Sequence, residues 1–145
     1  MQTQLDYLKI YKDNKNIFDE CEYNFARYSI GYSLAIIKLN KHIIHKKIHL
    51  KQFIRLTDKC IKIDEKYIIL VLIETNLNTG FDILYNIEKN LIRKYQLYDY
   101  NSEKVFKSAI ITKNHTFEIK EMLQKICYIV ENVSKNCLIE TEEDI

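Results

Sequence analysis

Lys59-Cys-Ile-Lys-Ile63, Asp64-Glu-Lys66 and Tyr67-Ile-Ile-Leu-Val-Leu-Ile73 form the stretch that decides the fold. The last of these runs is entirely apolar, largely β-branched and bounded by polar residues, which is typical of a strand buried on both faces. The first alternates polar and apolar residues, as a neighbouring strand with one exposed face does. The segment between them is short enough for a hairpin connection. The sequence therefore predicts a β-hairpin at the centre of the fold.

Working outward, apolar spacing predicts the other elements. They are a short helix that ends at Asp13-Asn14, a helix over 16–28, a strand over Tyr32–Asn40, a helical spacing over Lys41–Thr57 that ends near Arg55–Asp58, a helix over Asn78–Tyr95, a strand over Val105–Thr112 and a helix over Thr116–Val133. The order α-β-α-β-β-α-β-α indicates an α+β, ferredoxin-like or nucleotide-cyclase-like fold. We expect an antiparallel sheet of four to five strands with the helices packed on one face.

Length and composition indicate one soluble domain. The chain has 145 residues, of which 47% are hydrophobic and 29% charged, and its net charge of +2 does not by itself indicate nucleic acid. We predict a single domain over 1–136 and an acidic tail over 137–145. The sequence shows no signal pattern and no membrane-spanning run, so we expect a cytoplasmic protein. Reduced thiols are expected at Cys21, Cys60, Cys127 and Cys137, which lack CxxC spacing.

Several segments together resemble a known family. Asp6–Tyr11 is similar to an opening D-x-L-T-x-L, and Asn14–Phe18 to a helix start N-R-x-x-F. Leu34–Asn40 sits where that family has a strand ending in D-x-D, and Lys62–Ile68 where it has R-x-G-G-D-E-F. Ile73-Glu-Thr75 then mimics the strand exit before the next helix. On these residues nearly the whole chain resembles the GGDEF domain of diguanylate cyclases.

The resemblance implies lost catalysis. In that family two metal ions are held by carboxylates on the first strand and the hairpin, and they activate the 3′-hydroxyl and neutralise the triphosphate. The corresponding positions in this chain are Lys38, Asn40, Asp64, Glu65 and Lys66. A cation at Lys38 would repel Mg²⁺, the hairpin glycines are missing, and the segment from Lys38 to Arg55 is too short for the family's guanine-reading residues. We therefore predict no enzymatic activity, no catalytic residue, no metal and no cofactor.

One element of the family keeps its residues. Arg55-x-x-Asp58 lies six residues before the hairpin signature, where active cyclases carry the RxxD inhibitory site for cyclic di-GMP. An Arg fork can donate to guanine O6 and N7 or to phosphate, and an Asp can accept from guanine N1–H and N2–H. We propose Lys51 and Lys59 as auxiliary phosphate contacts. The alternative is a structural ion pair at the end of a helix, which requires no ligand.

The segment before this pair is basic and contains three histidines. It carries Lys38, Lys41, Lys46, Lys47, Lys51 and Arg55 with no acidic residue. Such a face can meet phosphates or an acidic partner, and it can equally be a solvated helix face. His42, His45 and His49 would share one side of a helix, but no Cys or carboxylate completes a metal site nearby.

These observations lead to one functional expectation with two alternatives. The chain is expected to be a catalytically inactive GGDEF-like signalling module, with cyclic di-GMP as the candidate ligand at Arg55 and Asp58. The first alternative is a protein-interaction or scaffold domain without a nucleotide, which docks a partner through the inactive active-site face or the acidic tail. The second and weaker alternative is nucleic-acid binding through the Lys41–Arg55 face.

Overall fold

The computed structural model describes residues 5–40, 43, 48–96 and 106–132. In chain order these form α1 (Tyr7–Asp13), α2 (Lys15–Tyr28), β1 (Tyr32–Leu39), a 3₁₀ helix η1 (Leu50–Phe53), β2 (Lys59–Lys62), β3 (Tyr67–Ile73), α3 (Leu77–Tyr95), β4 (Phe106–Thr112) and α4 (Ile119–Asn132). Among the residues just given, no helix has both the length and the apolar character needed to cross a bilayer. The predicted order of elements is confirmed except between β1 and β2.

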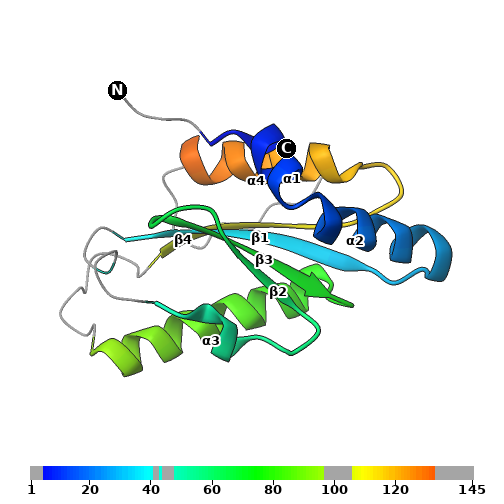
Figure 1. Ribbon diagram of the computed structural model, residues 1–145. Helices are drawn as coiled ribbons and strands as arrows, with labels where there is room; N and C mark the ends of the chain where they lie inside the picture. The colour runs from blue at the N-terminus through cyan, green and yellow to red at the C-terminus, as the bar shows by residue number, and fades with distance from the viewer. Residues whose placement is uncertain (1–4, 41–42, 44–47, 97–105, 133–145) are drawn as a thin grey trace.

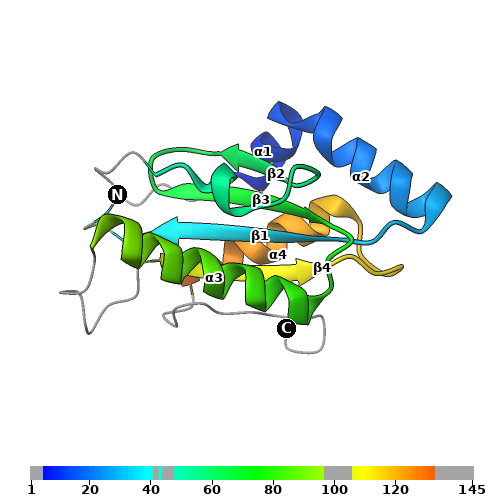
Figure 2. The same cartoon turned by 90° about the horizontal axis from the view of Figure 1, so that it is seen from below.

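The strands form one antiparallel sheet in the order β2-β3-β1-β4 (Figure 2). β1 pairs with β3 on one side and with β4 on the other, so that Ile36 lies opposite both Ile69 and Ala109. β2 and β3 form the predicted hairpin, with Ile61 opposite Ile69. The α+β fold with an antiparallel sheet is thus confirmed, and the described residues contribute four strands to it.

The helices cover both faces of the sheet, so the expectation that they lie on one face is wrong (Figure 1). The elements that connect β1 to β2 and β3 to β4, η1 and α3, pack on the face that carries Ile37 and Leu70. The helices before β1 and after β4 pack on the other face, which carries Leu34 and Ile69. The physical reason is that β1 and β3 have apolar side chains on both faces, and each face needs its own covering layer.

The helix expected across 41–57 is also wrong in the part that the structure describes. Only Leu50–Phe53 is helical there, as one short 3₁₀ turn, and Ile54 is extended with φ −121° and ψ 166°. Arg55–Asp58 is a turn rather than a helix end, closed by a hydrogen bond of 3.0 Å from the Asp58 N–H to the Arg55 carbonyl. The Asp58 carboxylate also accepts from the Arg55 N–H at 3.2 Å, and such a side-chain bond competes with helix formation.

Local backbone features fix the path of the chain from β3 into α3. After β3, Glu74 is left-handed with φ 51°, and its N–H donates to the Gly31 carbonyl at 2.7 Å. The chain then enters α3, whose N-cap Asn76 accepts from the Thr79 N–H at 2.9 Å. Gly80 allows α3 to lie close to β4, because a Cβ at this position would be 2.2 Å from Ile110 Cδ1.

Candidate functional site

The first candidate region is the hairpin edge, which we define as Lys38 at the end of β1, the 64–66 turn and Tyr67. Lys38 lies opposite Tyr67 in the β1–β3 ladder, and the next N–H, that of Leu39, donates to the Lys66 carbonyl at 2.8 Å. Asn40 follows, and its carbonyl accepts from the Ile43 N–H at 3.0 Å. The structure therefore brings the end of β1 against the 64–66 turn; the equivalence of these residues to the metal-holding positions of a cyclase stays a prediction.

The charges at the hairpin edge do not resemble a metal site. The Lys38 ammonium lies 5.9 Å from the centre of the Tyr67 ring, and Lys38 is directly opposite Lys107 in the β1–β4 ladder. Burial raises the pKa of the Tyr67 phenol to about 12, and the nearby Glu131 and Asp64 carboxylates add to the shift. In the part of the chain that the structure describes, no three His, Cys, Asp or Glu side chains are grouped as metal ligands.

The turn carboxylates have different surroundings. Asp64 Oδ1 accepts from the backbone N–H groups of Lys66 at 2.7 Å and Tyr67 at 2.9 Å, so this carboxylate holds the hairpin turn itself. Glu65 and Lys66 are exposed at the tip. Both bonds are made to one oxygen, so Asp64 Oδ1 is used in shaping the turn.

The second candidate region is the Arg–Asp corner, which we define as Arg55, Asp58, Ile73 and Thr75. The Asp58 side chain is fully buried and faces the Arg55 guanidinium, whose Nε donates to Oδ2 and whose Nη2 donates to Oδ1, each at 3.1 Å. Oδ1 also accepts from the Ile73 N–H at 2.9 Å, and Oδ2 from the Arg55 N–H at 3.2 Å. Asp58 therefore fastens the 55–58 turn to the last residue of β3.

Arg55 has one fixed side and one open side. Its Nη2 also donates to Thr75 Oγ1 at 2.7 Å and to the Ile73 carbonyl, whereas Nη1 has no partner among the described residues. The Arg55 side chain is 49% exposed. It borders a depression of about 390 Å³ between η1 and α3, lined by Gln52, Phe53, Ile54, Arg55, Asp58, Thr79 and Ile83. The walls are largely apolar, with one cationic group at the rim.

Sequence reasoning missed the hydroxyl groups that support this corner. The Thr75 carbonyl accepts from the buried Ser33 hydroxyl at 2.6 Å, and Ser33 Oγ lies 2.8 Å from Thr112 Oγ1. Arg55 is thereby connected through Thr75 and Ser33 to β1 and β4. The available signal was the hydroxyl residues Ser33 and Thr112 in largely apolar strands, since a buried hydroxyl usually has a partner.

The structure separates the two lysines predicted as auxiliary contacts. Lys51 lies on η1 and is exposed. Burial raises the pKa of the Cys60 thiol, and the nearby charge of Lys51 partly opposes that rise. Lys59 lies with Ile61 on the opposite face of the sheet. There its charge partly opposes the rise in the pKa of Cys21 that burial causes. Lys59 is therefore not brought to the Arg–Asp corner.

Most of the basic segment lies outside the described residues, namely Lys41, His42, His45, Lys46 and Lys47. His49 is described and exposed. The nucleic-acid interpretation, and the interpretation of the three histidines, stay predictions.

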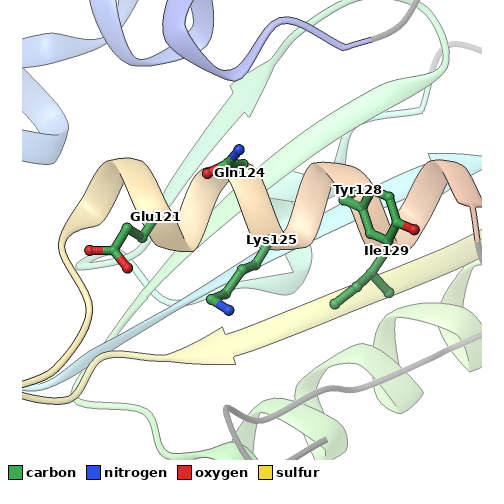
Figure 3. Close-up of a pocket in the computed structure, with 5 residues that line it drawn as sticks. All are labelled: Glu121, Gln124, Lys125, Tyr128 and Ile129. Atoms are coloured by element: carbon green, nitrogen blue, oxygen red, sulfur yellow. The ribbon is translucent and has the colours of Figure 1, made fainter. Parts of the chain in front are cut away.

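A third region, the α4 stripe, was not anticipated from the sequence. It borders a hollow of about 320 Å³ and consists of Glu121, Gln124, Lys125, Tyr128 and Ile129. Figure 3 shows these side chains projecting from α4, with Lys125 and Ile129 pointing the same way. Tyr128 is 66% exposed. The signal in the sequence was on the side of this helix opposite its predicted core positions. There an aromatic residue, Tyr128, lies among polar residues.

No family model matches the sequence, and no curated protein matches it. Solved structures do resemble the fold. The GGDEF domain of DgcB from Caulobacter crescentus, solved in complex with c-di-GMP, superposes with a TM-score of 0.66 at 9% identity, over 91% of this chain and 90% of that chain. The diguanylate cyclase SiaD from Pseudomonas aeruginosa, solved with its activator SiaC, superposes with a TM-score of 0.62 at 12% identity, over 87% of this chain and 55% of SiaD. The chain has a GGDEF-like fold.

Proposed function

We propose that this protein is a non-catalytic GGDEF-like signalling module that works by binding. The observation that carries the loss of catalysis is Lys38, an ammonium at the end of β1 beside the hairpin turn. Of the turn carboxylates, Asp64 uses Oδ1 to accept from the backbone of its own turn, and Glu65 is exposed at the tip. Positive charge opposes the binding of Mg²⁺, so the two-metal chemistry of the cyclases has no support at this edge.

The ligand that we propose is cyclic di-GMP, bound at the depression beside the Arg–Asp corner. Arg55 offers the two N–H groups of Nη1 and an open guanidinium face, and Phe53 and Ile83 supply apolar walls. A concave apolar surface with a few convergent polar groups is the usual form of a small-molecule site. The DgcB domain of similar fold was itself solved with c-di-GMP.

Isothermal titration with cyclic di-GMP tests this proposal. We expect micromolar or tighter binding that is lost in Arg55→Ala. The matched control is Arg27→Ala, which removes an exposed arginine on α2, on the other face of the sheet, and should leave binding unchanged. A flat titration of the unmodified protein would contradict the proposal. Incubation with GTP and Mg²⁺ should give no cyclic dinucleotide, and product formation would contradict the loss of catalysis.

A second candidate function is docking of a protein partner on the α4 stripe. The observation in its favour is the exposed Tyr128 beside a hollow, because tyrosine is enriched among residues that dominate binding energy. SiaD, which has a similar fold, was solved with an activator protein. A partner that is lost on Tyr128→Ala but retained by Arg55→Ala would favour this function, and Tyr23→Ala, at an exposed tyrosine of α2, is the matched control.

A further inference from the structure

The Asp58 carboxylate has no acceptor capacity left for a ligand. Each of its two oxygens accepts two hydrogen bonds, from the guanidinium and N–H of Arg55 and from the N–H of Ile73. A carboxylate offers about four such lone-pair positions. The side chain is also fully buried. To accept from guanine N1–H and N2–H, Asp58 would have to leave the corner. The backbone N–H of Ile73 in β3 would then lose its acceptor.

The hydrogen-bonding edge of Arg55 is committed as well. A guanidinium has five N–H donors, and the Nε and Nη2 groups already face Asp58, Ile73 and Thr75. Bidentate recognition of guanine O6 and N7 requires a free pair of parallel donors on two nitrogen atoms. Nη1 alone remains available, together with the exposed face of the planar group. These can meet one phosphate oxygen and one aromatic ring, respectively.

We infer that Asp58 is a positioning residue and that the corner binds cyclic dinucleotides without reading the edge of the base. This inference rests on the proposed function and adds its specificity. Recognition then consists of a phosphate contact from Nη1, stacking of a purine on the Arg55 face, and apolar contact with Phe53, Ile54 and Ile83. None of these contacts distinguishes guanine from hypoxanthine or adenine, because every purine has the same planar face.

The experiment compares cyclic di-GMP, cyclic di-IMP and cyclic di-AMP by titration into the full chain. Cyclic di-IMP lacks the 2-amino group of guanine, and cyclic di-AMP differs along the whole base edge. We expect the three Kd values to agree within about threefold, since a base-edge contact that is read would separate them by on the order of 10- to 100-fold. Cyclic di-GMP binding at least tenfold tighter than cyclic di-IMP would overturn the inference and leave the proposed function standing. Failure of all three to bind would remove both.

Asp58→Asn separates positioning from contact. If Asp58 only holds Arg55, the variant weakens the three ligands by the same factor. If Asp58 touches the base, the variant weakens cyclic di-GMP and leaves cyclic di-AMP unchanged, which overturns the inference. Thr75→Val removes one acceptor of Nη2 without touching the carboxylate, and it should likewise weaken all three ligands equally. Should Asp58→Asn fail to fold, the analogue series on the unmodified chain decides the question alone.

Discussion

The hairpin edge and the Arg–Asp corner lie at opposite ends of β3, since Tyr67 begins the strand and Ile73 ends it. At the hairpin edge the positions expected of a cyclase are brought together, but a lysine stands where a metal-holding acid is expected. At the corner the expected residues, Arg55 and Asp58, are both present, but they are bonded to each other and to the sheet. At the hairpin edge a cation, Lys38, lies beside the turn, and at the corner most of the donors and acceptors of the Arg–Asp pair are occupied.

The presence of a motif does not establish that its hydrogen-bonding atoms are available to a ligand. Arg55-x-x-Asp58 satisfies the RxxD pattern, yet Asp58 is fully buried, and Nη1 is the only terminal nitrogen of Arg55 without a partner among the described residues. The atoms that a residue still has free decide what it can bind. Substitutions at each end of β3 measure how much the side-chain hydrogen bonds and charges there contribute to stability.

Removal of the Asp58 carboxylate should have the largest effect. Asp58→Ala takes four hydrogen bonds from the corner and leaves the N–H of Ile73 without its acceptor. We expect a loss of about 2–4 kcal/mol in the free energy of unfolding, because a buried charged acceptor is removed and a backbone donor is orphaned. Urea denaturation measures the change.

Asp82→Ala is the control, since Asp82 is an exposed carboxylate on α3 and its removal should change stability by less than about 0.5 kcal/mol. If Asp58→Ala were as harmless as the control, Asp58 would not hold the corner together. Its carboxylate would then be available to a ligand, and the contrast between the two ends of β3 would disappear.

The sequence predicted most of the fold because its patterns are local. The apolar run over 67–73 and the amphipathic spacing of α3 and α4 each lie within one element, so periodicity identifies them. The placement of helices on both faces follows from β1 and β3 being apolar on both sides. Crossover handedness alone predicts helices on one face, whereas the apolar residues on both sides of β1 and β3 require helices on both. The helix expected over 41–57 does not extend to its predicted end near Arg55–Asp58. The Asp58 side chain there accepts from the Arg55 N–H and stabilises a turn.

The sequence predicted which residues form the candidate site, but it did not predict which of their hydrogen-bonding atoms are already occupied. The resemblance to the GGDEF domain predicted Lys38 beside the hairpin and Arg55 with Asp58 as a pair. The commitment of Asp58 depends on the N–H of Ile73, 15 positions away, and that of Arg55 on Thr75, 20 positions away. No local pattern encodes such contacts, because they arise only when the β2–β3 hairpin brings the two segments together.

At the hairpin edge we expect Tyr67 to make the free energy of unfolding depend on pH in the alkaline range. Its pKa is raised to about 12 in the folded chain from an ordinary value of 10.0, so the folded state holds the proton more tightly. This contribution is complete below pH 10 and is lost as the pH rises towards 12. Between these values the unmodified protein should lose about 1–2 kcal/mol more unfolding free energy than Tyr67→Phe. Equal losses in the two proteins would show that the phenol is not buried at this edge.

Loss of the turn carboxylate should have a smaller effect than loss of the corner carboxylate. Asp64→Ala removes the acceptor of the exposed N–H of Lys66 and of the part-buried N–H of Tyr67, and water can reach the first of these most easily. We expect a loss of about 1 kcal/mol, the usual value of a capping side chain. Asp64→Asn keeps an acceptor oxygen and should recover most of the loss. A cost as large as that of Asp58→Ala would mean that the hairpin edge is as firmly committed as the corner.

The smallest expected effect is a gain from removing one of the two facing lysines. Lys38 and Lys107 are directly opposite in the β1–β4 ladder, and neither has a carboxylate partner among the described residues. Like charges in this position repel, so Lys107→Met should stabilise the protein by a few tenths of a kcal/mol at low salt. The gain should shrink in 1 M salt, where the screening length falls to about 3 Å.

Lys62→Met is the matched control, because Lys62 lies opposite the apolar Ile68 and its removal relieves no repulsion. A loss of stability in Lys107→Met would instead show that an anionic group neutralises the pair. The hairpin edge would then be a paired site, like the Arg–Asp corner, and Lys38 would count as evidence for an anionic ligand as well as against a metal. A salt-sensitive gain in Lys107→Met alone would show that Lys38 and Lys107 repel each other without a neutralising anion.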